Sequence, residues 1–213
     1  MGYEIVDVEK SSRKKAYDKF INAKNPMMTM TSKVDITRLY KLSKKGFKLN
    51  CLLMYAIIKA AEKNENFYYE LKGKQLVKFD KLSSNVVIYG DDGELYYVTI
   101  PDCQNYLLFE KTYVELVEKC KKECSHYYLS DAALLGTSAV VNSTFESIVC
   151  GYTEDFLSHF LTWGKYEKRL TKVNLNISFR FHHALLDGRD VGEFFANLNK
   201  IVADFKIDSK VSK

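Results

Sequence analysis

The chain has 213 residues, of which 46% are hydrophobic and 28% are charged, so a disordered chain is excluded and one globular domain over residues 1–213 is expected. Its 32 Lys and Arg residues exceed its 27 Asp and Glu residues by only five, with the two signs interleaved, so no nucleic-acid partner is expected, whereas an anionic small molecule would suit the surface. No stretch approaches the ~20 apolar residues of a membrane helix and no secretion signal is recognisable, so a cytoplasmic protein with no membrane partner is expected.

The first third of the chain is predicted to begin with a strand and to end with a buried helix. In chain order, the elements are a strand at 3–6, a helix at 13–24, a strand at 29–34, a short helix at 35–46 and a helix at 49–63. Pro26 ends the first helix, because the residue before a proline avoids the helical conformation. Residues 49–63 have the strongest amphipathic pattern in the chain and should pack on the core.

The remainder of the chain is predicted to be richer in strands. A hairpin at 67–79 and strands at 85–89 and 95–100 precede a helix at 106–124. Strands at 135–141, 147–152, 160–166 and 173–181, a helix at 191–205 and a mobile tail at 206–213 follow. Polar and apolar residues alternate most clearly at 173–181, as in a strand with one buried face. This order of elements predicts the α+β class.

The five cysteines are predicted to be free thiols, because an odd number at irregular spacing does not form a disulfide framework in a chain without a secretion signal. Cys120 and Cys124 lie four residues apart on a predicted helix, with His126 close behind. No second ligand pair follows at the spacing of a zinc site, so no metal is expected.

The strongest chemical signal is a pair of histidines directly after the last predicted strand. His182 and His183 precede a turn at Asp187 and Gly188, so an imidazole there would be held rigidly at the edge of a cleft. Its ordinary pKa of about 6.5 suits proton transfer at neutral pH. The alternative is that the two histidines only end the strand.

Residues 182–188 read His-His-Ala-Leu-Leu-Asp-Gly and resemble the His-His-x-x-x-Asp-Gly signature of the CoA-dependent acyltransferase superfamily. Segments 13–17, 31–37 and 162–166 are similar, in order and spacing, to segments of the type A chloramphenicol acetyltransferases. The resemblance implies a single-domain two-layer sandwich of a large mixed β-sheet with packed helices. It also implies a homotrimer with active sites at the subunit interfaces.

The resemblance further implies direct acetyl transfer in a ternary complex, with no acyl-enzyme. His183 would be the general base that takes a proton from the acceptor hydroxyl. Asp187 would pair with Arg13 and hold the loop that carries the imidazole. Ser138 would donate its hydroxyl to the developing oxyanion, and Thr162 would support the same intermediate through a water. Without the resemblance, a lone serine in a strand would be read as structural.

Acetyl-CoA is the co-substrate that the resemblance implies. Lys48 and Lys165 match basic positions near the CoA phosphates, and Tyr166 matches an aromatic residue near the adenine. The alternative for the two lysines is a solvated surface charge.

The acceptor pocket departs from the family pattern. Phe20 is aromatic, as the family residue at this position is, whereas Met28 stands where phenylalanine is usual. Tyr96 is also aromatic as in the family, but the segment around it differs from the family pattern. Three functions follow in decreasing order of preference: O-acetylation of chloramphenicol, which gives antibiotic resistance, the same transfer to another small hydroxylated acceptor, and a non-catalytic CoA-binding trimer.

Overall fold

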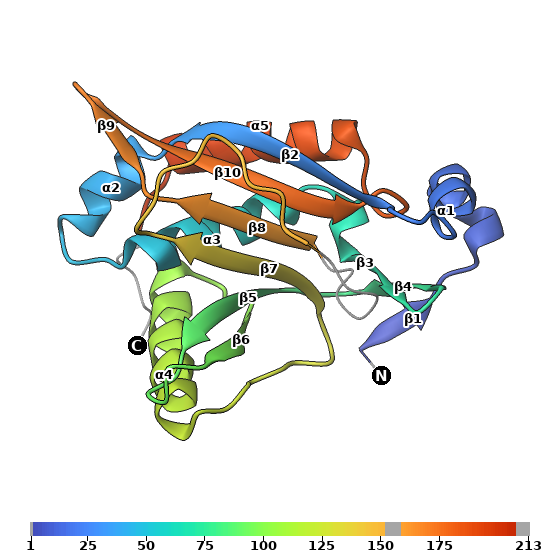
Figure 1. The fold of residues 1–213 in the computed structure, drawn as a ribbon, viewed down its shortest axis with the longest axis horizontal. Coiled ribbons are helices and arrows are strands. Elements are labelled where there is room, and N and C mark those ends of the chain that lie inside the picture. The colour runs from blue at the N-terminus through green and yellow to red at the C-terminus, as the bar shows by residue number, and fades with distance from the viewer. Residues whose placement is uncertain (1, 152–158, 208–213) are drawn as a thin grey trace.

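A seven-stranded mixed sheet forms the centre of the molecule, seen in a computed structural model that describes residues 2–151 and 159–207. The strands of the sheet are β2 (Met27–Asp35), β5 (Leu82–Tyr89), β6 (Leu95–Pro101), β7 (Ala133–Val140), β8 (His159–Gly164), β9 (Glu167–Arg169) and β10 (Lys172–His182). Six of them run in the order β2-β10-β8-β7-β5-β6, and β9 pairs with the start of β10 (Figure 1).

Two of the strand pairs are parallel. β7 pairs in parallel with both β5 and β8, whereas β10 is antiparallel to β2 and β8. A parallel partner requires a crossover connection, and between β5 and β7 the chain passes through β6 and the helix α4 (Tyr106–Glu123). The centre of the sheet is therefore built from segments far apart in the sequence.

Helices cover one face of the sheet. They include α2 (Thr37–Ser43), α3 (Leu49–Ala61) and α5 (Gly188–Ala203), which contact one another. In Figure 1, α3 and α5 lie behind the strands and α2 lies at the left of the sheet. The alternation predicted for 173–181 sets this arrangement, because the apolar residues of β10 point toward the helices. Phe179, for example, is fully buried with its ring 5.3 Å from that of Phe194 in α5.

The N-terminal part of the chain forms a smaller layer beside the main sheet. A three-stranded sheet contains β1 (Tyr3–Ile5), β3 (Tyr69–Lys72) and β4 (Gln75–Phe79). Two short 3-10 helices, at Val8–Lys10 and Glu65–Tyr68, and the helix α1 (Lys14–Phe20) complete the described elements. α1 lies at the end of the sheet where β10 ends (Figure 1).

The predicted α+β sandwich of a large mixed sheet with packed helices is confirmed. The first helix, predicted at 13–24, ends earlier at Phe20, because the Asn25 side chain accepts the Met27 N–H and turns the chain into β2. No described helix is long and apolar enough to cross a membrane. Most of the predicted tail, residues 208–213, lies outside the described residues.

The strand predicted at 147–152 is wrong for its described residues, 147–151. The Ile148 N–H donates 3.0 Å to the Ser178 hydroxyl, and Asn176 donates 2.9 Å to the Phe145 carbonyl. The backbone of this segment thus binds side chains of β10 and not the backbone of a neighbouring strand. The segment crosses the sheet on the face opposite the helices (Figure 1). Tyr152 lies outside the described residues.

Candidate active site

The loop that follows β10 holds His183 at three points. Its backbone N–H donates 2.9 Å to the Pro26 carbonyl, and its ring stacks on Phe20 with the centroids 4.0 Å apart. Its Nδ1 lies 3.2 Å from the carbonyl oxygen of Leu186. Phe20 thus lies against His183, and the strand pairing of Met28 with Phe181 places Met28, which is 44% exposed, near the same loop.

The contact with Leu186 fixes the tautomer of His183. A carbonyl oxygen can only accept a hydrogen bond, so Nδ1 must carry the proton. Nε2 of the neutral ring then holds the lone pair. The half-buried ring can therefore take a proton through Nε2.

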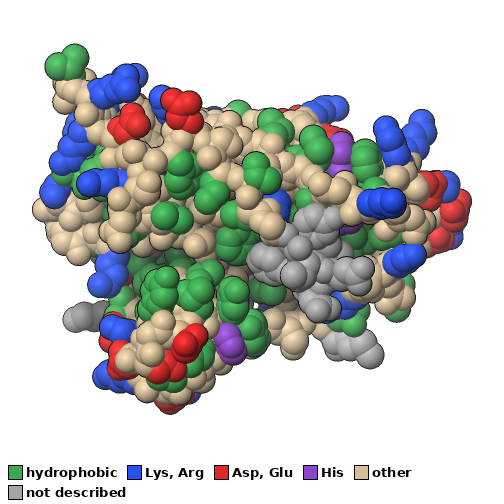
Figure 2. All heavy atoms as spheres, in the orientation of Figure 1, with side chains coloured by type: hydrophobic (Ala, Val, Ile, Leu, Met, Phe, Trp, Pro, Cys, Tyr) green, Lys and Arg blue, Asp and Glu red, His purple; other side chains and the backbone are tan. Residues whose placement is uncertain are grey.

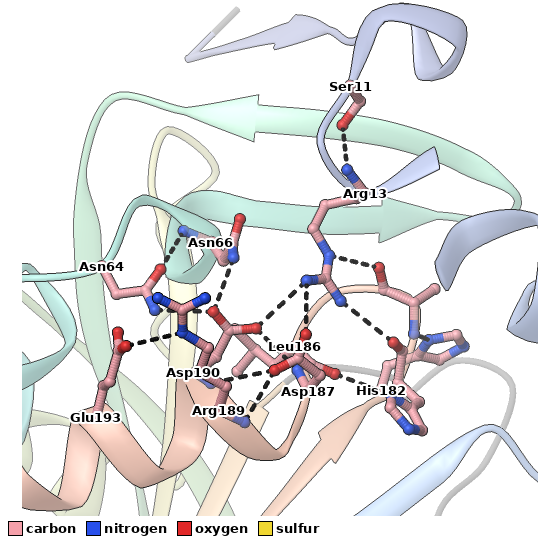
Figure 3. Close-up of polar contacts among 12 residues, drawn as sticks. Ser11, Arg13, Asn64, Asn66, His182, Leu186, Asp187, Arg189, Asp190 and Glu193 are labelled. Carbon is pink, nitrogen blue, oxygen red and sulfur yellow. Dashed lines mark hydrogen bonds and ion pairs between the residues drawn. The ribbon is translucent and has the colours of Figure 1, made fainter. Parts of the chain in front are cut away.

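Arg13 is buried beneath this loop, as Figure 3 shows. Its Nε donates 3.2 Å to the Ala184 carbonyl, and its Nη2 donates 3.4 Å to the His183 carbonyl. Its Nη1 lies 3.4 Å from Asp187 Oδ2 and 3.3 Å from Asp190 Oδ2. The structure thus brings together the three residues His183, Arg13 and Asp187 that the sequence singled out.

Asp187 also begins α5. Its Oδ1 accepts the N–H groups of Arg189 at 2.9 Å and Asp190 at 3.2 Å. Partial burial acts to raise the pKa of the Asp187 carboxyl, but these backbone donors and Arg13 outweigh it and lower the pKa. The predicted start of this helix at Val191 is wrong by three residues, because the Asp187 cap stabilises Gly188 as the first helical residue.

His182 and His159 are buried and neutral at pH 7. Burial and the neighbouring His183 lower the pKa of His182 to about 4, and its Nδ1 accepts the Ala184 N–H at 3.1 Å. Burial, with smaller contributions from His182 and Arg180, lowers the pKa of His159 to about 3. The sequence analysis missed His159, which begins β8 between buried aromatic rings.

A row of hydroxyl groups crosses four strands on the face opposite the helices. The strand registers place Ser138, Thr162, Ser178 and Thr31 side by side on β7, β8, β10 and β2. Thr31 Oγ1 lies 2.7 Å from Ser178 Oγ, and Thr162 Oγ1 lies 3.2 Å from the Cys150 thiol. The predicted residues Ser138 and Thr162 are thus direct neighbours in this row.

Two cavities lead from Lys48 to Ser138. Ser138 and Trp163 line a cavity of about 500 Å³, and Lys48 lines another of about 420 Å³. The two cavities share the lining residues Asn50 and Tyr113, so they lie next to each other. In Figure 2 hydrophobic side chains gather on the viewed face over β5 and β7, next to the larger cavity. A long ligand with an anionic end near Lys48 would fit this path.

Lys165 and Tyr166 directly follow β8, next to the rim of the larger cavity. The Lys165 N–H donates 2.7 Å to the Ser143 carbonyl, and its side chain is exposed. The ring of Tyr166 lies 5.2 Å from that of Tyr40, and Lys168 Nζ lies 4.5 Å from the Tyr40 centroid. The sequence analysis missed Tyr40 and Lys168, because their proximity arises only from the fold.

The predicted site residues form separate groups within one chain. The strand registers align Ser138 with Ser178, which lies on β10, five residues before His183. About 16 Å of extended strand therefore separates the row of hydroxyl groups from the histidine. Tyr96 lies on β6 at the opposite edge of the sheet from β2, where its hydroxyl donates 2.6 Å to Asp92. The chain alone therefore does not bring Tyr96 to Phe20 and Met28, or Ser138 to His183.

The sequence matches one family model, described as chloramphenicol acetyltransferase, over residues 1–199. A chloramphenicol acetyltransferase from Clostridium perfringens is 24% identical over 214 residues, covering 97% of each chain. Chloramphenicol acetyltransferase 3 from Escherichia coli is 23% identical over 208 residues, covering 94% of this chain and 97% of that protein.

Solved structures show the same fold. A chloramphenicol acetyltransferase superposes with a TM-score of 0.79 at 19% identity, covering 94% of this chain and 99% of the other. The cubic core of the pyruvate dehydrogenase multienzyme complex superposes with a TM-score of 0.68 at 18% identity, covering 94% of this chain and 90% of the other. The large mixed sheet with packed helices is thus shared across these proteins.

Proposed function

Because the chain belongs to the chloramphenicol acetyltransferase family and is an acyltransferase, we propose that it transfers the acetyl group of acetyl-CoA to a hydroxyl group of chloramphenicol. The observation that carries this proposal is the fixed tautomer of His183, whose Nδ1 is held by the Leu186 carbonyl. A base whose lone pair has one fixed direction suits abstraction of a proton from an alcohol. A bacterium that makes such an enzyme would resist chloramphenicol.

In the proposed reaction both substrates are bound together. Nε2 of His183 takes the proton of the acceptor hydroxyl, and the oxygen forms a bond to the thioester carbonyl carbon. The Ser138 hydroxyl donates to the negative charge that develops on the carbonyl oxygen, and Thr162 supports it through a water. The bond to sulfur then breaks, and the CoA thiolate receives the proton from His183.

The two neighbouring cavities support acetyl-CoA as the donor. Lys48, which lines the smaller cavity, would bind a phosphate of CoA, and Lys165 and Tyr166 closely follow Trp163, which lines the larger one. The thioester would then lie in the larger cavity beside Ser138. The separation of Ser138 from His183 within one chain supports a homotrimer in which adjacent subunits complete each site.

Release of free CoA thiol from acetyl-CoA, measured with and without chloramphenicol, tests this function. We expect chloramphenicol to stimulate release in the wild-type protein and His183→Ala to abolish the stimulation. A control change at an exposed position on α4, Lys119→Ala, should leave the rate unchanged. If chloramphenicol does not stimulate thiol release, chloramphenicol is excluded as the acceptor.

Another hydroxylated acceptor is the second candidate, favoured by the side chains exposed beside the His183 loop. Arg189, which directly follows Gly188, has an exposed side chain, and Met28, 44% exposed, stands where phenylalanine is usual in the family. A lining with these side chains would suit a more polar alcohol than an aromatic wall would. Thiol release with a panel of small alcohols distinguishes the two candidates, because the better acceptor gives the higher kcat/KM.

A further inference from the structure

Two carboxylates converge on Arg13, and they differ in burial (Figure 3). The Asp190 side chain is 11% exposed, whereas the Asp187 side chain is 44% exposed. An ion pair with little solvent around it is screened less than an exposed one. At nearly equal distances, Asp190 is therefore the stronger electrostatic partner of Arg13.

The Asp190 carboxylate is fixed in place by four donors. Its Oδ1 accepts from the side-chain amides of Asn64 and Asn66, each at 2.9 Å. Its Oδ2 accepts the Asp187 N–H at 2.8 Å as well as the contact from Arg13. Hydrogen bonds thus fix the positions of both Asp190 oxygens, so the Arg13 guanidinium faces a carboxylate of defined orientation.

The two carboxylate oxygens of Asp187 have different partners. One oxygen caps α5 through the N–H groups of Arg189 and Asp190, and the other reaches Arg13. Asp190 instead connects Arg13 to Asn64 and Asn66, which lie at the start of the 3-10 helix Glu65–Tyr68. Arg13 in turn donates to the backbone carbonyls of two consecutive residues of the turn, His183 and Ala184.

We propose that Asp190 is a positioning residue, and that it holds the His183 loop by orienting Arg13. The inference rests on the proposed function, in which His183 is the base. The order of contacts runs from Asn64 and Asn66 to Asp190, from Asp190 to Arg13, and from Arg13 to the His183 carbonyl. A small rotation of the guanidinium would therefore move the imidazole.

Asp190→Asn tests the proposal with almost no change in volume. The new amide keeps an acceptor for Asn64 and Asn66 but directs a donor at Arg13 and at the Asp187 N–H. We expect kcat to fall about 100-fold, as for a misplaced catalytic group, with both KM values within about twofold. Glu193→Gln, the matched change one turn further along α5, should leave kcat unchanged, since Glu193 binds the exposed Arg189.

A double-mutant cycle with Arg13→Lys separates positioning from a general loss of stability. If Asp190 acts through Arg13, the double variant loses no more kcat than the worse single variant. Losses that multiply, or an Asp190→Asn kcat within about threefold of the wild type, would overturn the proposal. All rates are compared below the measured Tm of each variant.

Labelling His183 with diethyl pyrocarbonate, read by mass spectrometry, does not depend on the acceptor. We expect faster labelling in Asp190→Asn than in the wild type and in Glu193→Gln, because the ring is less firmly held on Phe20. Equal rates in all three proteins would overturn the positioning role. Absence of acetyl transfer in the wild type would overturn the proposed function alone.

A milder variant keeps the test valid if Asp190→Asn does not fold. Asn66→Ala removes one amide donor from Asp190 and changes no charge. We expect a several-fold fall in kcat at unchanged KM. A kcat equal to that of the wild type would count against the proposal.

Discussion

At the residue scale, the geometry of the site is set by the hydrogen bonds that its polar side chains make with their neighbours. The Leu186 carbonyl fixes the His183 tautomer, and the donors to Asp187 and Asp190 fix both carboxylates. Each of these contacts removes a rotational freedom that catalysis would otherwise have to restrict.

Ser138→Ala should lower kcat about 100-fold, the typical effect of losing one oxyanion donor. The affinity for acetyl-CoA should not change, because the hydroxyl would act only on the developing charge. Thiol release and calorimetric CoA binding measure the two effects. Ser143→Ala, on an exposed position nearby, serves as the control, and unchanged turnover in Ser138→Ala would remove Ser138 from the mechanism.

The sequence allowed part of this site to be predicted. The proximity of Arg13 to Asp187 followed from the resemblance and is present in the structure. Asp190 did not stand out in the sequence, because its partners Asn64 and Asn66 are more than a hundred residues away and carry no motif. Contacts between single amides and carboxylates have no periodicity that a sequence pattern can reveal.

At the scale of elements, the segment that crosses the open face of the sheet is held by side-chain hydroxyls. Its apolar residues suggested a strand, yet Val149 is 77% exposed and the Ile148 N–H binds Ser178. The parallel pairing of β7 was equally hidden from the sequence, because alternation shows that a strand exists but not which strand lies beside it. In contrast, the alternation of β10 and the long apolar run of α3 were recognisable, and the bounds of both were predicted closely. The amphipathic pattern expected for residues 49–63 is wrong, because α3 is buried on nearly every side; α5 is the more amphipathic helix.

Ser178→Ala should therefore loosen the crossing segment. The change removes the acceptor of the Ile148 N–H and a partner of Thr31, and we expect it to lower the free energy of unfolding by about 2 kcal/mol. Urea unfolding measures the loss, and limited proteolysis should cut residues 143–151 faster. Val149→Ala, at a 77% exposed position in the segment, should change stability by less than about 0.5 kcal/mol.

At the scale of the whole molecule, the separation of the two groups of site residues has a direct test. If adjacent subunits complete each site, a mixture of His183→Ala and Ser138→Ala chains assembled together should recover activity that neither variant has alone. Some interfaces would then contain an intact histidine from one chain and an intact serine from the other. Mixtures no more active than the separate variants would exclude a shared site.

The two buried histidines predict acid sensitivity. Their pKa values, about 4 for His182 and about 3 for His159, lie below the value of 6.5 that an unfolded chain would have. The unfolded state therefore binds more protons below pH 6.5, and stability should fall as the pH is lowered toward 4. Between pH 6.5 and 5 each histidine should account for about 2 kcal/mol.

His159→Phe should weaken this pH dependence, because it removes one of the two groups from an apolar site. Urea unfolding at pH 7 and pH 5 measures the difference. Val149→Ala, an exposed substitution that changes no titratable group, should retain the full slope. A slope unchanged in His159→Phe would show that His159 does not contribute to it.

The contact between Arg13 and the His183 carbonyl joins positions 170 residues apart in the chain. During synthesis, Arg13 leaves the ribosome long before its partners exist, and β2 is likewise made long before β10. A nascent or truncated chain that lacks β10 would present β2 as an unpaired strand, open to pairing with another chain. Enzymatic activity would then be among the last properties that the chain acquires, and premature termination would favour aggregation over a partly active product.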